Sequence, residues 1–401
     1  MTELRKIKVK NGKRCFQKRK GRVKKYVLRS LLVFFTLILL VLALVVSVVA
    51  KIAHGPSETF RDALVLSAMQ ASATKWVPGL FLGNEEVERI LALSSQVKEE
   101  YISLDDYKNN YADSNKPGSS RPGDPGSSNP GGPDDPQTDE WANAINGMKF
   151  ETIAHPNFKG YVLLVRDPSR VYVGTSSDFT DPKVEGLDIF DLAKKENCIV
   201  AINGGEFDDP GGVGTGNTPK GLTYSKGACV WDQSTYKTFI GLTAEHKLVV
   251  YKDLTKEKAD EIGIRDGVCF QTTNAENILI SNDGKTVTLH RADSNTAVSQ
   301  RTAIGQREDG TLIFLVTDGR SAESLGATYN DCIDIMVKYG AITAGMLDGG
   351  SSSMLYYENF WEYYTQYNYD SLGRYQKKGL INNYKAFTMP RQIPTFFCVA
   401  R

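Results

Sequence analysis

The chain has 401 residues, and its 48 Lys and Arg side chains nearly balance 47 Asp and Glu, which leaves a formal net charge of +1. Thirteen of the basic residues lie within residues 1–29 beside a single acid, Glu3, so the remainder has 35 basic and 46 acidic side chains. A remainder that is about eleven charges negative repels polyanions in general, which argues against a nucleic-acid partner.

An apolar segment follows the basic tail. Residues 30–50 are 21 residues without a charge, enough for a helix to cross a hydrocarbon core of about 30 Å. The positive-inside rule places the tail in the cytoplasm and everything after Lys51 outside. Cleavage as a signal peptide after Ala50 is the alternative, but the apolar segment exceeds the usual signal-peptide core. We therefore expect a retained single-pass cell-membrane anchor, with an extracytoplasmic remainder.

Composition divides this remainder into three parts. Residues 54–110 are predicted to form a helical membrane-proximal segment, because Ser57 to Gln70 and Asn84 to Glu100 each begin at a capping residue and space apolar residues helically. Residues 111–139 are rich in Pro, Gly, Ser and Asp, which predicts a flexible linker. We expect cleavage there to release a folded domain beginning near residue 140, and residues 140–401 are long enough for one sizeable core.

Strands dominate the pattern of this last part. Short β-branched or aromatic sequences predict strands at residues 159–167, 197–203, 238–243, 247–252, 277–281, 286–290, 311–318 and 394–400. Turn sequences predict three hairpins, at residues 245–246, 282–284 and 308–310. A capping box of Thr328 and Asp331 predicts a helix that Gly340 ends, and a second helix is expected from Asp188 to Glu196. We therefore expect an α+β fold with a mixed or antiparallel sheet.

Cysteine and histidine usage exclude several kinds of site. Cys198, Cys229, Cys269, Cys332 and Cys398 lie beyond the anchor in apolar surroundings and form no C-x-x-C pair, which favours buried thiols and leaves one or two disulfides open. The chain has no H-E-x-x-H zinc motif and no G-x-S-x-G nucleophile motif, and its four His are scattered. Asp208 and Asp209 are a candidate calcium site without regular ligand spacing.

Three predicted strands end in Asn or Asp followed directly by glycine. These ends are Asn203-Gly204-Gly205, Asp318-Gly319-Arg320, and Asp348-Gly349-Gly350 followed by Ser351 and Ser352. Arg301 and Thr302 enter the hairpin that Asp318 leaves. Each end alone is an ordinary turn sequence, but together they bring convergent polar groups to bare backbone, which is typical of a binding site.

The order and spacing of these motifs resemble the phosphodiester glycosidase family, which includes many bacterial exopolysaccharide-biosynthesis proteins. The resemblance covers about residues 150–401 and rests on an Asn-Gly strand end, an Arg-Thr-Ala-Ile-Gly hairpin leading to Asp-Gly-Arg, a helix led by Gly-Ala-Thr, a Leu-Asp-Gly-Gly-x-Ser-Ser segment and an Arg-x-x-Pro-Thr-x-Phe ending. The last of these begins at Arg391. One departure is Glu206-Phe207, where many members have two aromatic residues.

The resemblance implies hydrolysis of a sugar whose anomeric carbon carries a phosphodiester. Such a reaction needs a carboxylate at the anomeric centre and cations on the phosphate. Asp318 and Asp348 are the candidate carboxylates, and Arg301 and Arg320 are the candidate phosphate ligands. Asn203 is expected to orient the sugar or a water. Sequence alone does not distinguish which Asp attacks.

The remaining substrate contacts are expected from backbone and hydroxyl groups. Gly349, Gly350, Ser351 and Ser352 are predicted to form a small anion nest, with Gly204, Gly205, Thr302 and Arg391 near the substrate. The expected partner is a phosphodiester-linked cell-surface glycan or oligosaccharide. No cofactor is required by this chemistry, although a divalent cation is compatible with the residues.

Two other functions fit the same residues. A metal-dependent phosphodiesterase would use Asp318 and Asp348 as ligands and cut the P–O bond. A non-catalytic wall-polysaccharide-binding protein would keep the scaffold without needing both carboxylates. The aromatic residues between 356 and 375 are either a sugar-stacking surface or a local packing elaboration.

Overall fold

The computed structural model describes most of the chain, namely residues 2–69, 74–94, 96–114, 140–181, 183–210, 214–233, 238–270, 277–292, 297–321, 323–364, 369–382 and 389–401. The chain divides into two compact units, Met1–Leu64 and Val65–Arg401. The predicted linker covers residues 111–139, of which residues 115–139 lie outside the described residues. Residues 111–114 form the end of a helix that begins at Leu104.

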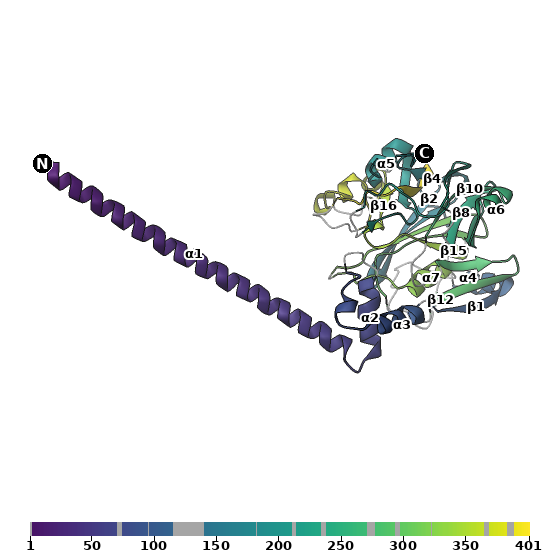
Figure 1. Ribbon diagram of the computed structural model, residues 1–401. Helices are drawn as coiled ribbons and strands as arrows, with labels where there is room; N and C mark the ends of the chain where they lie inside the picture. The colour runs from purple at the N-terminus through teal and green to yellow at the C-terminus, as the bar shows by residue number, and fades with distance from the viewer. Residues whose placement is uncertain are drawn as a thin grey trace, which may run out of the picture. The chain divides into compact units, whose positions relative to one another are not determined.

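The first unit consists mainly of α1 (Thr2–Ala53), which Figure 1 shows as one unbroken helix. Its part from Lys25 to Ala53 is long and apolar enough to cross a membrane, with a mean hydropathy of 3.2 over its most apolar window. A signal sequence near the N-terminus can meet the same length and hydropathy criteria, so this helix is either an anchor or a signal. The helix also continues through the basic tail, which the sequence predicted only as a cytoplasmic segment.

Three antiparallel sheets form the second unit. The eight-stranded sheet has the order β1-β12-β11-β15-β13-β14-β3-β2, with strands β1 (Val97–Ser103), β2 (Met148–His155), β3 (Phe158–Val165), β11 (Ile278–Asn282), β12 (Thr286–Ala292), β13 (Thr302–Arg307), β14 (Leu312–Thr317) and β15 (Ala341–Leu347). The five-stranded sheet has the order β7-β6-β10-β8-β9, with β6 (Thr223–Ser225), β7 (Ala228–Trp231), β8 (Thr238–Thr243), β9 (Leu248–Lys252) and β10 (Ile264–Cys269). The four-stranded sheet has the order β16-β5-β17-β4, with β4 (Val171–Thr175), β5 (Cys198–Asn203), β16 (Leu355–Tyr357) and β17 (Thr395–Ala400).

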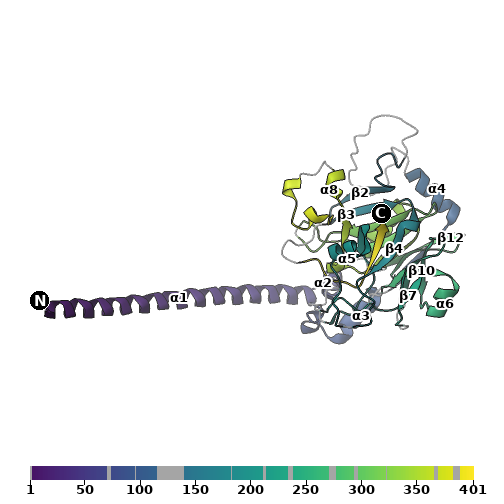
Figure 2. The same cartoon turned by 90° about the horizontal axis from the view of Figure 1, so that it is seen from above.

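Short helices connect these strands. They are α2 (Glu58–Met69), α3 (Asn84–Ser94), α4 (Leu104–Ser114), α5 (Ile189–Glu196), α6 (Lys256–Glu261), α7 (Tyr329–Lys338) and α8 (Phe360–Tyr363), with 3-10 turns η1 (Pro78–Leu80), η2 (Pro168–Arg170), η4 (Gly350–Ser352), η5 (Tyr369–Ser371) and η6 (Gln376–Lys378). In Figure 2, α6 lies beside β7 and β10. The predicted α+β fold with antiparallel sheets is therefore confirmed.

Local sequence signals account for several of these elements. The three predicted hairpins exist, as β8–β9, β11–β12 and β13–β14. The capping box at α7 is complete, because the Thr328 side chain accepts from Asp331 N and the Asp331 carboxylate accepts from Thr328 N at 2.7 Å. Asp188 caps α5 in the same way, accepting from Phe190 N and Asp191 N.

The central strands of the eight-stranded sheet are buried on both faces. Successive residues of β14 alternate between two cores: Ile313 and Leu315 pack in the core that contains α7, whereas Leu312, Phe314 and Val316 pack toward strands of the other two sheets. Side chains alternate across a strand, so a strand covered on both faces is apolar throughout. This explains the continuous apolar sequence of residues 312–316.

The thiols of the second unit are not paired. Cys198, Cys269, Cys332 and Cys398 are buried and free, and Cys229 is half-buried and free. Buried thiols, the favoured prediction, are therefore what the structure contains.

The predicted helix from Asn84 to Glu100 is correct only as far as Ser94. Residues 97–103 form the edge strand β1, and all seven pair with β12, from Val97 opposite Ala292 to Ser103 opposite Thr286. The β-branched and aromatic residues in this segment suit a strand, and a long-range partner overrode the helical spacing. The membrane-proximal segment predicted as helical is thus helical only in part, and it contributes a strand to the main sheet.

A protease site placed within residues 115–139 tests this arrangement. We expect the fragments to stay together after cleavage, because seven residue pairs join β1 to β12 and the buried Tyr107 hydroxyl donates to Ala341 O at 2.7 Å. Size-exclusion chromatography of the detergent-solubilised full chain, before and after cleavage, measures this. Separation of the fragments without denaturant would restore the expectation of an independently released domain beginning near residue 140.

Candidate active site

The eight-stranded sheet brings two of the three predicted strand ends to one edge. β13 lies between β14 and β15 and runs antiparallel to both, with Thr302 opposite Val316 on one side and Leu347 on the other. Asp318 follows β14 and Asp348 follows β15, so the two acids flank the start of β13. Two strand spacings separate their backbones, about 10 Å.

The third strand end belongs to the four-stranded sheet and meets the other two through Asn203. The Asn203 amide donates to Asp348 O at 2.6 Å, and its oxygen accepts from the Thr302 hydroxyl at 2.8 Å and from Met354 N at 3.1 Å. Asn203 and Thr302 are fully buried. Both therefore lie behind the site and position Asp348. Their direct contact with a sugar stays a prediction.

The glycines after Asn203 are required by chain packing. A Cβ added to Gly204 would lie 2.5 Å from the Thr395 hydroxyl, and one added to Gly205 would lie 2.3 Å from Cys269 O. Strands β17 and β10 thus approach the backbone here. At Gly349 and Gly350 the space is more open, with Gln300 O at 3.0 Å and Arg320 Nη1 at 3.8 Å as the nearest atoms.

Asp348 carries the most perturbed carboxyl group of the site. Its side chain accepts from Gly349 N at 2.8 Å and from the Ser352 hydroxyl, and part of its surface remains accessible although protein atoms surround the carboxyl closely. Burial raises the pKa of Asp348 to about 7, and the negative charge of Glu206 raises it further, against the Ser352 bond and the charge of Arg391. A carboxyl with such a pKa can take up and release a proton near neutral pH.

Asp318 is held by a residue that the sequence did not indicate. The Tyr161 hydroxyl of β3 donates to Asp318 Oδ2 at 2.7 Å, and Asp318 N donates to Lys159 O at 2.9 Å. Asp318 is only 4% exposed. Its carboxylate is therefore fixed in direction at the edge of the sheet.

Two arginines lie next to these strand ends in sequence, Arg301 just before β13 and Arg320 two residues after Asp318. Arg301 is buried, and its guanidinium donates to Ala327 O at 3.2 Å and Ala297 O at 2.9 Å. Arg320 is half-buried, and the pKa of its guanidinium is lowered by burial and by the charge of Arg301. Within the described ranges no acid forms an ion pair with either guanidinium.

Arg320 also holds an unusual backbone conformation. Its φ is +54°, in the left-handed region that costs a non-glycine residue roughly 1–2 kcal/mol. The loop that imposes it is closed by Arg320 N donating to Leu325 O at 3.0 Å. Strain of this kind is found most often at functional sites.

Several polar atoms around Arg320 have no hydrogen-bond partner among the described residues. They are Arg320 Nη2, Gln300 Oε1, Ser324 Oγ and Ser353 Oγ, all buried. Buried polar atoms are nearly always paired, so a group of unpaired ones calls for a ligand or water. The sequence analysis did not select Gln300, Ser324 or Ser353.

The turn from Gly349 to Ser352 is only partly available to a ligand. Gly349 N binds the Asp348 side chain, Gly350 N donates to Gln300 O at 3.0 Å, and Ser352 N donates to Gly349 O at 3.2 Å. These amides are already used within the protein. The predicted anion nest is therefore not preformed, whereas the serine hydroxyls lie at its edge.

Arg391 ties this turn to the loop after β5. Its Nη1 donates to the Ser351 hydroxyl at 3.1 Å, its other terminal nitrogen pairs with Asp209, and its guanidinium lies 5.0 Å from the centre of the Phe207 ring. Asp209, a predicted calcium ligand, is thus engaged by an arginine. In the part of the chain that the structure describes, no three His, Cys, Asp or Glu side chains gather as metal ligands.

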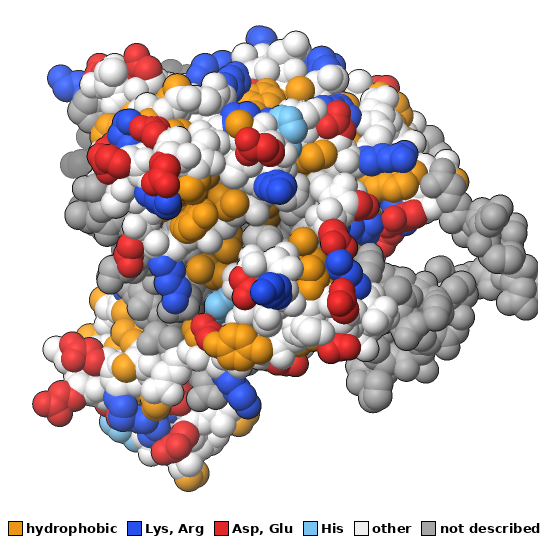
Figure 3. Space-filling model, turned by 90° about the vertical axis from the view of Figure 1, so that its right-hand side faces the viewer, with side chains coloured by type: hydrophobic (Ala, Val, Ile, Leu, Met, Phe, Trp, Pro, Cys, Tyr) orange, Lys and Arg blue, Asp and Glu red, His pale blue; other side chains and the backbone are white. Residues whose placement is uncertain are grey.

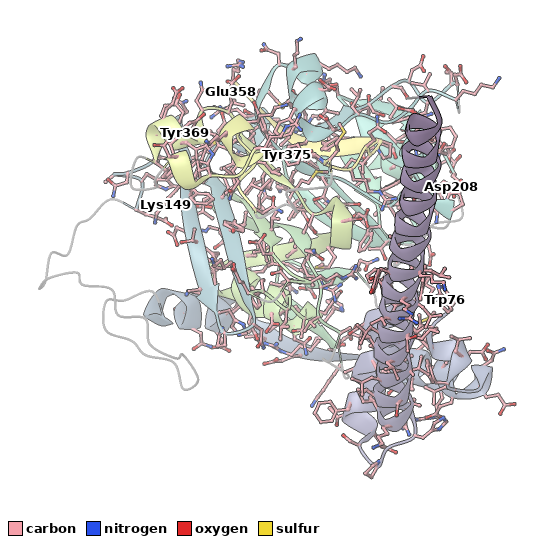
Figure 4. All side chains as sticks on the ribbon, turned by 90° about the vertical axis from the view of Figure 1, so that its left-hand side faces the viewer. Trp76, Lys149, Asp208, Glu358, Tyr369 and Tyr375 are labelled. Carbon is pink, nitrogen blue, oxygen red and sulfur yellow. The ribbon has the colours of Figure 1, made fainter. Side chains whose placement is uncertain are left out.

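The aromatic residues between 356 and 375 are mainly a packing elaboration. Tyr357 and Phe360 are buried in the core between the sheets, and Phe360 stacks on Tyr364 at 4.3 Å. Residues 365–368 lie outside the described residues. Tyr369 is exposed. Figure 4 shows it far from Asp208, whose two sequence neighbours contact Arg391.

Charged side chains of both signs cover one face of the protein. On the face shown in Figure 3, acidic and basic side chains are interspersed, with apolar patches between them.

The family model described as phosphodiester glycosidase matches residues 196–400, slightly more than half of the chain. The chain belongs to the phosphodiester glycosidase family. The matched range contains all three strand ends, both arginines and Arg391, and excludes β3 with Tyr161.

The chain is also similar to individual proteins. It is 30% identical over 200 residues to the SPbeta prophage-derived uncharacterized protein YomE of Bacillus subtilis (strain 168), a stretch that is 47% of this chain and 27% of YomE. The chain thus spans about a quarter of that curated relative. The zebrafish N-acetylglucosamine-1-phosphodiester alpha-N-acetylglucosaminidase catalytic domain, solved in a form auto-inhibited by its pro-peptide, has 19% identity and a TM-score of 0.47, covering 63% of this chain and 82% of that one. A putative exported protein of Burkholderia pseudomallei K96243 has 13% identity and a TM-score of 0.40, covering 61% of this chain and 74% of that one.

The raised pKa of Asp348 makes the stability of the folded protein depend on pH. Its pKa of about 7 in the folded protein lies above the ordinary 3.8, so folded chains keep a proton that unfolded chains release. Stability therefore falls as pH rises from about 4 to 7 and levels off above that. Asp348→Asn removes this loss. We expect its melting temperature, relative to wild type, to rise by roughly 2–6 °C between about pH 4.5 and pH 8.

Asp309→Asn is the control for this measurement. Asp309 accepts from Thr311 N at 2.9 Å in an ordinary hairpin turn, and an asparagine oxygen can take the same bond. Its melting difference from wild type should not change with pH. A difference that is equally flat for Asp348→Asn would contradict the raised pKa.

Proposed function

We propose that this member of the family is a membrane-anchored, extracytoplasmic hydrolase that cleaves the glycosidic bond of glycosyl-1-phosphodiesters in cell-surface or exopolysaccharide metabolism. The family membership supports a glycosidase acting on phosphodiester-linked glycans. The apolar helix from Lys25 to Ala53, behind a basic tail, supports membrane attachment with the catalytic unit outside.

The observation that carries this proposal is a pair of arginines that form no ion pair with any acid in the described part of the chain. Arg320 Nη2 is buried and unpaired within the described residues, and Arg301 supplies a second positive charge close enough to lower the Arg320 pKa. Burying two like charges is unfavourable unless an anion compensates them. The phosphodiester of the substrate is the proposed anion, with Arg320 as its direct ligand and Arg301 as a fixed charge beneath.

The two carboxyl groups then have separate tasks. Asp348, with a pKa of about 7, is the proposed proton-transfer group, since it is partly protonated at neutral pH. Asp318, directed by the Tyr161 hydroxyl, is the proposed carboxylate that faces the anomeric carbon. The phosphate monoester that departs is already a good leaving group. Its protonation therefore contributes less to the rate than in an ordinary glycosidase.

A metal-dependent phosphodiesterase is the second candidate. It would use the same two aspartates as ligands and break the P–O bond. The arginines favour the first candidate, because they supply the charge on phosphate that a metal would otherwise provide. A cofactor-free reaction is part of our proposal.

The position of bond cleavage distinguishes these two reactions. A synthetic glycosyl-1-phosphate methyl diester is hydrolysed in water enriched in heavy oxygen, and the products are analysed by mass spectrometry. We expect the label in the free sugar, because attack is at carbon. Label in the phosphate product would favour the phosphodiesterase.

The two carboxyl groups are tested separately by substitution. Asp318→Asn and Asp348→Asn keep side-chain shape and hydrogen-bonding capacity but remove the negative charge. We expect each to lower the turnover of the same diester by at least about 100-fold, the usual scale for a positioned acid or base, while melting stays near or above wild type at pH 7. Asp309→Asn should keep full turnover. Retention of activity by both site variants would show that these strand ends are only turns.

A further inference from the structure

Residues 74–82 form a short turn between α2 and α3 that the proposed mechanism does not use. Leu80 N donates to Val77 O at 3.0 Å, and Leu82 N donates to Pro78 O at 2.9 Å, so the backbone here is coiled like a helix. In such a backbone, side chains four positions apart lie on the same side, and side chains two positions apart do not. The turn therefore has two sides.

These two sides differ in burial. Pro78 is buried, and Leu82 packs against the apolar cluster that joins α2 to α3. Trp76 and Leu80, on the other side, are 64% and 65% exposed. Trp side chains are highly buried on average in soluble proteins, and they are enriched where a surface meets a partner or a membrane. The exposed side of the turn thus indicates an interaction surface.

The chain limits how far the cluster beneath this turn lies from the apolar helix. From Ala53, the end of α1, the chain leads through residues 54–56 to Ser57, whose carbonyl accepts from Arg61 N at 3.2 Å as α2 begins. This connection spans at most about 14 Å, and the rise of α2 from Ser57 to Val65 adds about 12 Å. Val65 is part of the cluster, so at any angle between α1 and α2 the cluster lies within about 30 Å of the end of α1.

Charge favours one kind of surface for this turn. Lys75 precedes Trp76, but Glu85 and Glu86 follow in the first turn of α3, so the neighbourhood has no excess of positive charge to attract an anionic partner. An exposed Trp beside a Leu suits the boundary between lipid headgroups and acyl chains, where the amphipathic indole ring is commonly found. Burial of these two side chains there does not depend on the charge of the lipid.

We propose that the turn at residues 74–82 docks on the outer surface of the membrane that α1 crosses, with Trp76 and Leu80 inserted at the boundary between headgroups and acyl chains. The inference rests on the proposed function in one respect, the retention of α1 as an anchor, and does not depend on the reaction. Because α1 tethers the turn to the same bilayer, docking is an intramolecular step with a high effective concentration. Two apolar side chains therefore suffice for a contact that would be weak between separate molecules.

Docking of this turn also places the proposed active site. Ala297 packs against the same apolar cluster as Leu82, and its carbonyl accepts from Arg301 Nη2 at 2.9 Å. The docked turn and the start of β13 thus share one packed cluster. Insertion of Trp76 and Leu80 sets the distance of Arg301 from the bilayer.

Tryptophan fluorescence tests the docking directly. The four Trp are at positions 76, 141, 231 and 361, so α1 contains none, and quenching by bromine in the lipid reports on the second unit alone. The full chain is reconstituted as single molecules in nanodiscs of phosphatidylcholine, either unlabelled or brominated near the headgroup end of the acyl chains. We expect brominated lipid to quench wild-type fluorescence and Trp76→Phe to lose this quenching. Leu80→Ser, which keeps Trp76 but removes half of the apolar contact, should reduce it.

Two matched controls accompany these variants. Trp361→Phe removes a partly buried Trp whose Nε1 donates to Gln376 O, and Val184→Ser removes an exposed apolar side chain of another loop. Both should keep the wild-type quenching. Absence of quenching in wild type, or equal quenching in wild type and Trp76→Phe, would overturn the inference.

Failure of the proposed function is recognised by other measurements. A mature chain that begins near Lys51 in cells, found by mass spectrometry, rejects the retained anchor, and absence of diester hydrolysis by wild type rejects the reaction. Neither result alters the quenching of the full chain in nanodiscs, which decides whether the turn enters lipid.

Discussion

The side-chain amide of Asn203 is the junction on which the site depends. Asn203 is the last residue of β5 in the four-stranded sheet. Its side chain forms hydrogen bonds with the Thr302 hydroxyl of the eight-stranded sheet, with Met354 N and with Asp348 O. Asn203, Thr302 and Met354 are buried, so loss of one partner leaves a buried polar group unpaired at a cost of about 1–3 kcal/mol. Register in both sheets is thereby coupled to the position of one carboxyl group. A shift of either sheet would displace Asp348 before it disturbed the core.

Buried charge is the second constraint, and here the protein tolerates an unfavourable arrangement. Arg301 and Arg320 lie close together without an ion-paired acid among the described residues, Asp348 is desolvated enough to hold a proton near neutral pH, and Arg320 has a left-handed backbone. Each feature destabilises the folded chain when no ligand is bound. The packed sheets keep these three unfavourable features in place. A loss of stability in exchange for preorganised charges is expected at an active site.

Local chemistry made much of the fold predictable, and long-range pairing limited the rest. The hairpin turns, the Thr328 capping box and the Asp188 cap are decided within a few residues, and the structure has all of them. Strand β1 is different, because its partner β12 lies almost 200 residues later in the chain. Pairing with β12 makes a strand of a segment whose local sequence indicates a helix. Tyr161 is invisible for the same reason: nothing near it in sequence indicates Asp318, 157 residues away.

The three strand ends look equivalent in sequence, yet their glycines serve different purposes. After Asn203 they admit other strands, since Cβ atoms there would strike Thr395 and Cys269. After Asp318 the glycine packs against Ser299 and Gln300 and lets the chain turn into the strained loop of Arg320. After Asp348 the space is open toward Arg320. A shared Asx-Gly pattern therefore predicts which strand ends meet but does not assign roles to them, because roles depend on what approaches each backbone from a distant part of the chain.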